Sequence, residues 1–241
     1  NAAFRDAARL LSGVRDADTL IDTYDAVAER FEDQIDRRAF APIRARLTRE
    51  ANVAREDPET AARMERVRAD LEAARVRAAG WTLGAAGFDA VAGGLRKTYG
   101  RARKRMQAAW IEPTDTAMHE WRKRVKYHWY HARLLERTLP AMMEAHAAAA
   151  HDLSDLLGDH HDLAVLDARL AATPEIFGTA TDVAAFRALV ARHKQDLARD
   201  AFGLGRIVLA ERSKALAKRW SGYWKASKKD DADAKRLLVK A

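Results

Sequence analysis

The sequence predicts an all-α protein, built of two antiparallel helical bundles. Only 12 Gly and 5 Pro interrupt the 241 residues, so long helices fit the composition better than a turn-rich sandwich or barrel. Apolar residues recur at helical spacing along most of the chain, and no segment alternates with a period of two for long enough to be a strand. We therefore expect roughly nine or ten helices packed as bundles.

The first part of the chain contains three stretches with helical periodicity. Residues 4–31 are expected to form two helices or one bent helix, because a Ser-Gly pair at 12–13 interrupts the apolar pattern. Similar Ala- and Arg-rich stretches follow at 37–54 and 58–79. The last of these is preceded by an Asp-Pro pair at 57–58, which resembles an N-cap followed by Pro in the first helical turn.

The strongest pair of long helices is expected at 83–109 and 114–137. A Glu-Pro-Thr segment at 112–114 joins them, and Thr114 is a suitable N-cap for the second helix. Further helices are expected at 140–157, from near residue 159, at 182–202 and at 206–227.

Composition excludes several classes of protein. No Cys occurs, so disulfide scaffolds, thiolate zinc sites and Cys nucleophiles are ruled out. The sequence has no apolar stretch of about 18 residues and no signal-peptide pattern. We therefore expect a soluble, cytoplasmic protein with no membrane partner. We also expect that Asn1, which is not preceded by Met, is not the natural start of the protein.

The net charge of +8 is unevenly distributed. Residues 92–137 carry 12 Lys and Arg against 4 Asp and Glu, and residues 206–241 carry 11 against 4. The rest is net acidic, with 15 against 17 in residues 1–91 and 5 against 10 in residues 138–205. This distribution indicates a surface that binds an anion, although a solvated helix face is the alternative explanation.

A short internal similarity suggests two related halves. Residues 10–20 align without gaps on residues 156–166, a shift of 146 positions. Both segments contain a Leu pair, then a small residue, then Asp and Leu four positions apart. We therefore expect a first helical half at 1–91 and a second at 92–241, which together form one domain.

Basic residues form a stripe along the helix expected at 114–137. Four of them follow the spacing i, i+3, i+4 and i+7, which places them on one helix face: His119, Arg122, Lys123 and Lys126, here called the basic stripe. The only carboxylate within it is Glu120, which we expect to point elsewhere. Trp121, Val125 and Trp129 lie on another face and are expected to anchor the helix in the core. A bound polyanion would relieve the repulsion within the stripe.

The preceding helix carries a second set of basic residues. Arg96 and Arg103 share one face with Gly100, and Lys97, Arg101 and Lys104 share another. If the two helices form an antiparallel hairpin around Pro113, their basic faces could line opposite walls of one groove. Arg forks and Lys point charges in such a groove would suit phosphate oxygens.

These residues resemble the CHAD domain family, the conserved histidine α-helical domains. The similarity is strongest in the run His-x-x-Arg-Lys-x-x-Lys at 119–126, followed by Tyr130. It extends to the basic helix at 94–103, to the Leu-Leu-Gly segment at 156–158 with Asp162 and Leu166, to residues 4–6 and 11–16, and to residues 209–214 with Trp220, Tyr223 and Trp224.

The resemblance implies two bundles with pseudo-twofold symmetry around a basic, His-containing pore or cleft. It implies non-catalytic binding of inorganic polyphosphate, with no metal or other cofactor, and a role at polyphosphate granules. The basic stripe matches the family motif directly and supplies the first-rank ligands. Further candidate ligands are Arg96, Arg103, Lys97, Arg101, Lys104, Arg5, Arg15, Arg212 and Lys214.

Three features depart from the family pattern. The His/Arg/Lys helix expected in the first half would fall before Asn1, and we expect it upstream in the full-length protein. His160 and His161 stand where other residues are expected, and Trp129 replaces a residue that is often basic.

Two other functions remain open. The His161-Asp162 pair, with His119, His151 or His160 as further ligands, could indicate an HD-type metal-dependent phosphohydrolase. The positive charge, with Trp and Tyr interleaved among Arg and Lys at 121–133, could instead indicate nucleic-acid binding. The oligomeric state is left open.

Overall fold

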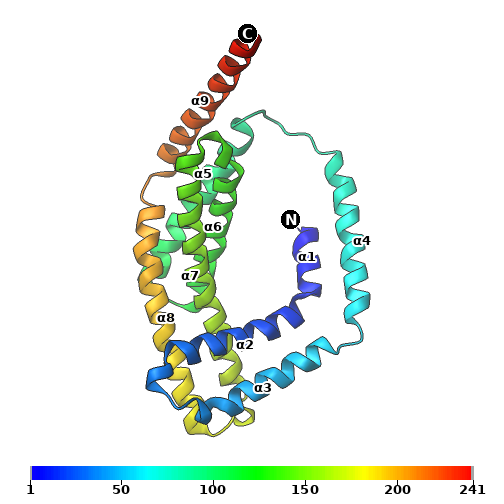
Figure 1. Ribbon diagram of the computed structural model, residues 1–241, viewed down its shortest axis with the longest axis vertical. Coiled ribbons are helices and arrows are strands. Elements are labelled where there is room, and N and C mark those ends of the chain that lie inside the picture. The colour runs from blue at the N-terminus through cyan, green and yellow to red at the C-terminus, as the bar shows by residue number, and fades with distance from the viewer. Residues whose placement is uncertain (1, 240–241) are drawn as a thin grey trace. The chain divides into compact units, whose positions relative to one another are not determined.

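The computed structural model describes the backbone of residues 2–239 and the side chains of residues 2–229 (Figure 1). This part of the chain contains helices and no strand, which confirms the predicted all-α class. The α-helices are α1 (Ala2–Leu10), α2 (Ser12–Arg30), α3 (Arg37–Arg55), α4 (Thr60–Ala79), α5 (Asp89–Ile111), α6 (Asp115–Leu134), α7 (Pro140–Ala172), α8 (Ala180–Val208) and α9 (Ser213–Val239). Short 3₁₀ segments lie at Glu32–Gln34, Glu136–Thr138 and Pro174–Ile176.

Several predicted helix boundaries are close to the observed ones. The expected break near residues 12–13 lies between Leu10, where α1 ends, and Ser12, where α2 begins. Thr114 is the N-cap of α6, and its Oγ1 accepts a hydrogen bond of 3.2 Å from the backbone N–H of Ala117. Asp57 accepts a hydrogen bond from the backbone N–H of Glu59, but α4 begins only at Thr60.

The predicted separation of two helices near residues 157–159 is wrong, because α7 runs unbroken from Pro140 to Ala172. Gly158 lies between the two expected helices, and glycine is a weak helix former. It is buried inside α7, and the apolar positions on both sides of it, Leu157 and Leu163, are buried as well. Burial of one continuous apolar face outweighs the local cost of one glycine.

The chain divides into two compact units, each described separately. The first unit contains the residues up to Thr82 together with Asp162–Lys194, and the second contains Leu83–His161 together with the residues from Gln195 onward. This division differs from the predicted halves 1–91 and 92–241. The difference arises because α7 and α8 are long, so each of them contributes residues to both cores.

Aromatic stacking organises the core of the first unit. Here α2 runs beside α3, and α1 runs beside α4 (Figure 1). The Tyr24 ring of α2 stacks on Phe186 of α8 with ring centroids 4.7 Å apart, and its hydroxyl donates a 3.0 Å hydrogen bond to the Phe40 carbonyl of α3. Arg187 pairs with Asp167 at 2.6 Å, which links α8 to the end of α7.

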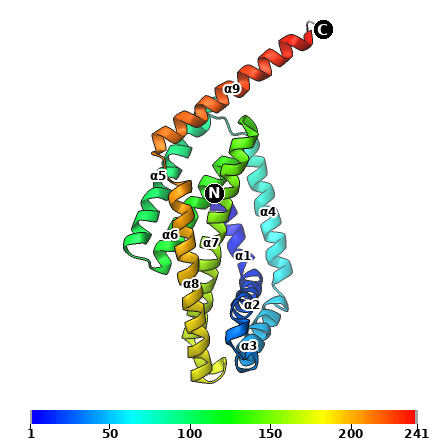
Figure 2. The same ribbon diagram turned by 60° about the vertical axis from the view of Figure 1, so that its left-hand side comes forward.

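The second unit is built on the antiparallel hairpin of α5 and α6, which Figure 2 shows side by side. Leu95 of α5, Trp121 and Val125 of α6, and Leu153 of α7 are fully buried in its core. The Trp121 ring lies directly on the backbone of α8, because a Cβ at Gly205 would be 2.6 Å from its Cζ2 atom. This contact fixes the rotation of α6 and hence the direction of the basic stripe.

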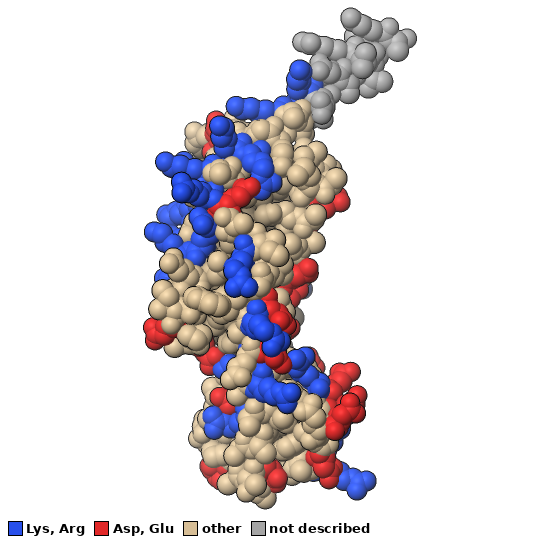
Figure 3. All heavy atoms as spheres, turned by 90° about the vertical axis from the view of Figure 1, so that its left-hand side faces the viewer, with Lys and Arg blue, Asp and Glu red and all other residues tan. Residues whose placement is uncertain are grey.

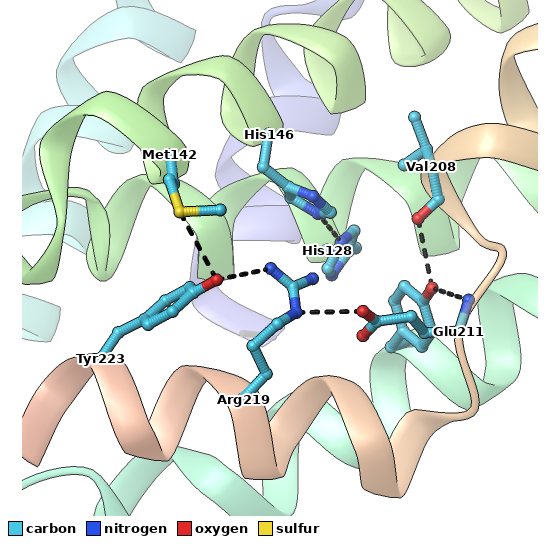
Figure 4. Close-up of polar contacts among 8 residues, drawn as sticks. His128, Met142, His146, Val208, Glu211, Arg219 and Tyr223 are labelled. Carbon is cyan, nitrogen blue, oxygen red and sulfur yellow. Dashed lines mark hydrogen bonds and ion pairs between the residues drawn. The ribbon is translucent and has the colours of Figure 1, made fainter.

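A buried polar network accompanies this core (Figure 4). His128 and His146 share a hydrogen bond of 2.8 Å between their Nε2 atoms. The Tyr99 hydroxyl donates to the Val208 carbonyl and accepts from the backbone N–H of Glu211, both at 3.2 Å. Arg219 of α9 binds Glu211 at 3.0 Å and Tyr223 at 3.2 Å.

None of the helices within the described residues combines the length and the apolar character that crossing a bilayer requires.

Candidate anion-binding site

The basic stripe occupies a face of α6 whose orientation is fixed by the core. Trp121 and Val125 are fully buried, as predicted for anchoring residues, and Trp129 is partly buried against the same core. All four residues of the stripe are half-buried. Their side chains therefore keep some access to solvent while their stems are held by neighbouring residues.

His119 lies against a second histidine, His161 of α7. The two ring centroids are 4.1 Å apart and the ring planes are tilted by 35°. Burial lowers the pKa of His119, and the neighbouring His161, Lys123 and Arg122 lower it further. Its Nδ1 atom is buried and has no hydrogen-bond partner among the described residues. His119 is therefore neutral at pH 7 in the free protein.

Arg122 lies against the backbone of α7 at Gly158. A Cβ at this position would be 3.4 Å from both Nε and Nη2 of Arg122. The Nε atom is buried without a hydrogen-bond partner, and the described residues offer Arg122 no carboxylate. The Leu-Leu-Gly segment thus allows a guanidinium to pack closely on α7 without neutralising it.

Glu120 does not point away from the stripe, and that expectation is wrong. Its carboxylate pairs with Lys123, and Arg124 lies 3.9 Å from its other oxygen. The hydrogen bond from Lys123 lowers the pKa of Glu120, so the carboxylate is ionised at neutral pH. The i,i+3 spacing allows this pairing, because both side chains can turn toward the helix edge. Arg122 and Lys126 have no such partner among the described residues.

Two of the basic residues of α5 line a cavity to which α6 does not contribute. Arg96, Lys97, Arg101 and Lys104 are exposed, and Arg103 is half-buried. Arg103 and Lys104 line a cavity of about 540 Å³ together with residues of α8 and α9, here called the α5–α8–α9 cavity. No residue of α6 lines it. These two cations thus border a cavity separate from the basic stripe.

The remaining candidate ligands are spread over the two units. In the first unit, Arg5 is exposed and pairs with Asp6 at 3.2 Å, and Arg15 lines a cavity that also contains Asp18 and Asp22. In the second unit, Arg212 and Lys214 are exposed beside Ser213, the first residue of α9. The four residues of the basic stripe are therefore grouped on one helix face, whereas the other candidate ligands are dispersed.

Sequence reasoning considered His161 with His119 only as possible metal ligands, and not as neighbours in the anion site. The internal alignment contained a signal, because His161 takes the position of Arg15 in the first segment. Within the part of the chain that the structure describes, no group of three or more His, Asp or Glu side chains is placed to hold a metal ion. His151, one of the histidines considered as a metal ligand, lies 2.5 Å from Asp155.

Lys and Arg gather on one side of the second unit. In Figure 3 they are concentrated along the left-hand edge of this unit. Figure 2, a similar view, shows α5 at that edge. The charge block at 92–137 thus lies in and just after the α5–α6 hairpin.

The fold and the basic stripe define an all-helical protein with a histidine-containing, positively charged helix face. Residues 1–171 match the model of the CHAD domain, so the chain belongs to the CHAD domain family. This family is associated with polyphosphate binding. The matched range contains the basic stripe and the Leu-Leu-Gly segment, whereas the resemblance noted at 209–224 lies outside it. No curated protein and no solved structure gives a significant match.

Proposed function

We propose that the protein binds inorganic polyphosphate without catalysing a reaction, and that the basic stripe is the centre of the binding site. One observation carries this proposal. Arg122 and Lys126 are half-buried on a rigid helix, next to the neutral His119, and no carboxylate of the described residues neutralises them. Partial burial weakens the hydration of these cations. An anion that covers them therefore gains more binding free energy than it would at a fully exposed site.

The chemistry of polyphosphate suits this arrangement. The polymer presents a row of anionic oxygens, which can contact the Arg122 guanidinium as a fork and the Lys126 ammonium as a point charge. A nearby anion favours the imidazolium form of His119. Binding should therefore take up a proton at His119, and affinity should rise as the pH falls through the range in which histidine titrates.

The proposal includes the finer arrangement that the family resemblance implies. It places the stripe in a basic pore or cleft formed by two pseudo-twofold-related bundles, with Arg96, Lys97 and Arg101 of α5 and the exposed cations at the start of α9 as secondary contacts. It also includes a role at polyphosphate granules. Membership of the CHAD family supports these features.

Charge reversal at the stripe provides the test. Arg122→Glu and Lys126→Glu should each weaken polyphosphate binding about tenfold or more, because each removes a cation from the site and adds a repelling anion. Lys228→Glu and Lys229→Glu change the net charge equally, at positions on α9 away from the stripe, and should have much smaller effects. Titration calorimetry with a polyphosphate of defined length measures this difference. Equal losses for all four variants would show that only the overall charge matters.

Nucleic-acid binding is the second candidate, and exposed aromatic rings favour it. Tyr127 and Tyr130 of α6 are each nearly half exposed, and the Arg124 guanidinium lies 5.9 Å from the centre of the Tyr127 ring. Such rings can stack on bases. Trp121, in contrast, is fully buried and unavailable for stacking.

A further inference from the structure

The α5–α8–α9 cavity is lined by cations and by apolar and aromatic side chains, and inorganic polyphosphate would contact only the cations. Its volume is about 540 Å³, within the range of small-molecule sites. All of its lining residues belong to the second unit. They are Gly100, Arg103, Lys104, Met106, Gln107 and Trp110 of α5, Phe202 and Arg206 of α8, and Leu209 and Ser213.

One part of the cavity is apolar and aromatic. Phe202 and Leu209 are almost completely buried, at 8% and 2% exposure, whereas Trp110 remains 61% exposed. The Trp110 and Phe202 rings meet edge to face with centroids 5.1 Å apart. An indole that is mostly exposed above a buried apolar surface offers a platform on which a flat ring can stack.

The other part of the cavity is strongly positive. Arg103, Lys104 and Arg206 are its three cations, and no Asp or Glu lines it. The described residues give none of the three an ion pair. Arg206 also lies over the indole, with its guanidinium carbon 5.9 Å from the centre of the Trp110 ring. The cations and the aromatic platform are therefore close enough for one small ligand to contact both.

The surrounding contacts hold the cavity in shape. The Tyr99 hydroxyl bonds to the backbone at Val208 and Glu211, which ties α5 to the segment between α8 and α9. The bare backbone of Gly205 packs on Trp121 and Met106, which fixes α8 against α6 and α5. A cavity braced in this way needs little reorganisation to receive a ligand.

We propose that this cavity binds a nucleotide, with the base stacked on Trp110 and the phosphates held by Arg103, Lys104 and Arg206. The Gln107 amide, which has both donor and acceptor groups, is available for the edge of the base. This binding site is separate from the basic stripe and goes beyond the binding of inorganic polyphosphate. It assigns Arg103 and Lys104, which the family resemblance suggested as polyphosphate ligands, to a different anion.

Comparison of ATP with inorganic tripolyphosphate tests the contribution of the base. The two ligands carry similar phosphate chains, so the cations should bind both, and the stacked base should make ATP binding about tenfold tighter. Trp110→Ala should reduce ATP affinity to that of tripolyphosphate. The matched control is Trp81→Ala, because Trp81 is similarly exposed, at 72%, and lies outside the cavity. Titration calorimetry measures all six affinities.

Two further variants separate this proposal from the polyphosphate proposal. Arg206→Gln should weaken ATP binding several-fold and leave binding of long-chain polyphosphate unchanged. Arg122→Glu should weaken binding of long-chain polyphosphate but keep the preference for ATP over tripolyphosphate, because the base supplies that preference. Equal affinities for ATP and tripolyphosphate, or equal effects of Trp110→Ala and Trp81→Ala, would overturn the nucleotide site. Loss of the preference for ATP in Arg122→Glu would also overturn it, because the nucleotide would then occupy the stripe.

Discussion

His128 and His146 form a neutral pair inside the second unit. Because their Nε2 atoms are 2.8 Å apart, one ring donates and the other accepts, and protonation of the accepting nitrogen would leave two N–H donors facing each other. Burial is the main cause that lowers both pKa values, well below the usual range for His128 and to about 4 for His146. The charged or titratable groups that face the pair are His131, Arg219, Glu211 and Tyr99.

We predict that this pair makes the protein sensitive to acid. Both histidines have lower pKa values in the folded state than in the unfolded state, so they stabilise the fold above about pH 6.5 and lose this contribution as the pH falls toward 4. For His146 the shift corresponds to roughly 3 kcal/mol. Urea unfolding at pH 7.0, 5.5 and 4.5 measures the loss.

The control for this prediction is His146→Gln, which keeps a polar partner for His128 but cannot titrate. Its free energy of unfolding should be lower than wild type at pH 7 and should depend less steeply on pH. Parallel pH dependences for the two proteins would show that acid sensitivity arises elsewhere.

The candidate site was partly predictable at the level of residues. The spacing of His119, Arg122 and Lys126 was enough to place them together, because helical periodicity is a local property. The Lys123–Glu120 pair was not predicted, since side-chain rotamers decide it. The packing of Arg122 on Gly158 depends on residues 36 positions apart in the sequence, which no local pattern reveals.

Among the helices, the α5–α6 hairpin was the most predictable element. The Pro and the Thr cap at 113–114 are local signals, and the long apolar periodicity on each side is strong. The continuity of α7 was not predictable, because Gly158 is tolerated only through burial against other helices. The assignment of parts of α7 and α8 to both units depends on tertiary packing as well.

The packing of α8 on α6 leads to a prediction about two glycines. In Gly205→Ala the new Cβ would lie 2.6 Å from Trp121 and 3.0 Å from Met106, so the indole must shift, and we expect a loss of about 1–3 kcal/mol. Gly203→Ala is the matched control on the same helix, because no atom lies within 4 Å of its Cβ position. It should stabilise the protein by up to about 1 kcal/mol through helix propensity.

Thermal and urea unfolding of both glycine variants measure these effects. If Gly205→Ala were as stable as Gly203→Ala, the result would contradict the close contact between α6 and α8 at Gly205.

At the scale of the whole molecule, the excess positive charge is organised into separate surfaces of the second unit. The basic stripe of α6 lies against α7, whereas Arg103 and Lys104 of α5 line the α5–α8–α9 cavity. The sequence predicted that 92–137 binds an anion, but it did not separate these surfaces. Their separation depends on contacts with α8 and α9, whose residues lie about 100 positions further along the chain.

Competition between polyphosphate and nucleic acid tests the central claim most directly. Labelled polyphosphate, bound to the protein at near-physiological salt, is challenged with unlabelled polyphosphate, single-stranded DNA or RNA at matched phosphate concentrations. A site made of cations recognises the phosphate chain itself, so we expect unlabelled polyphosphate to displace the label at concentrations at least tenfold lower than either nucleic acid. Equal or better displacement by DNA or RNA would contradict the account and favour a nucleic-acid-binding function.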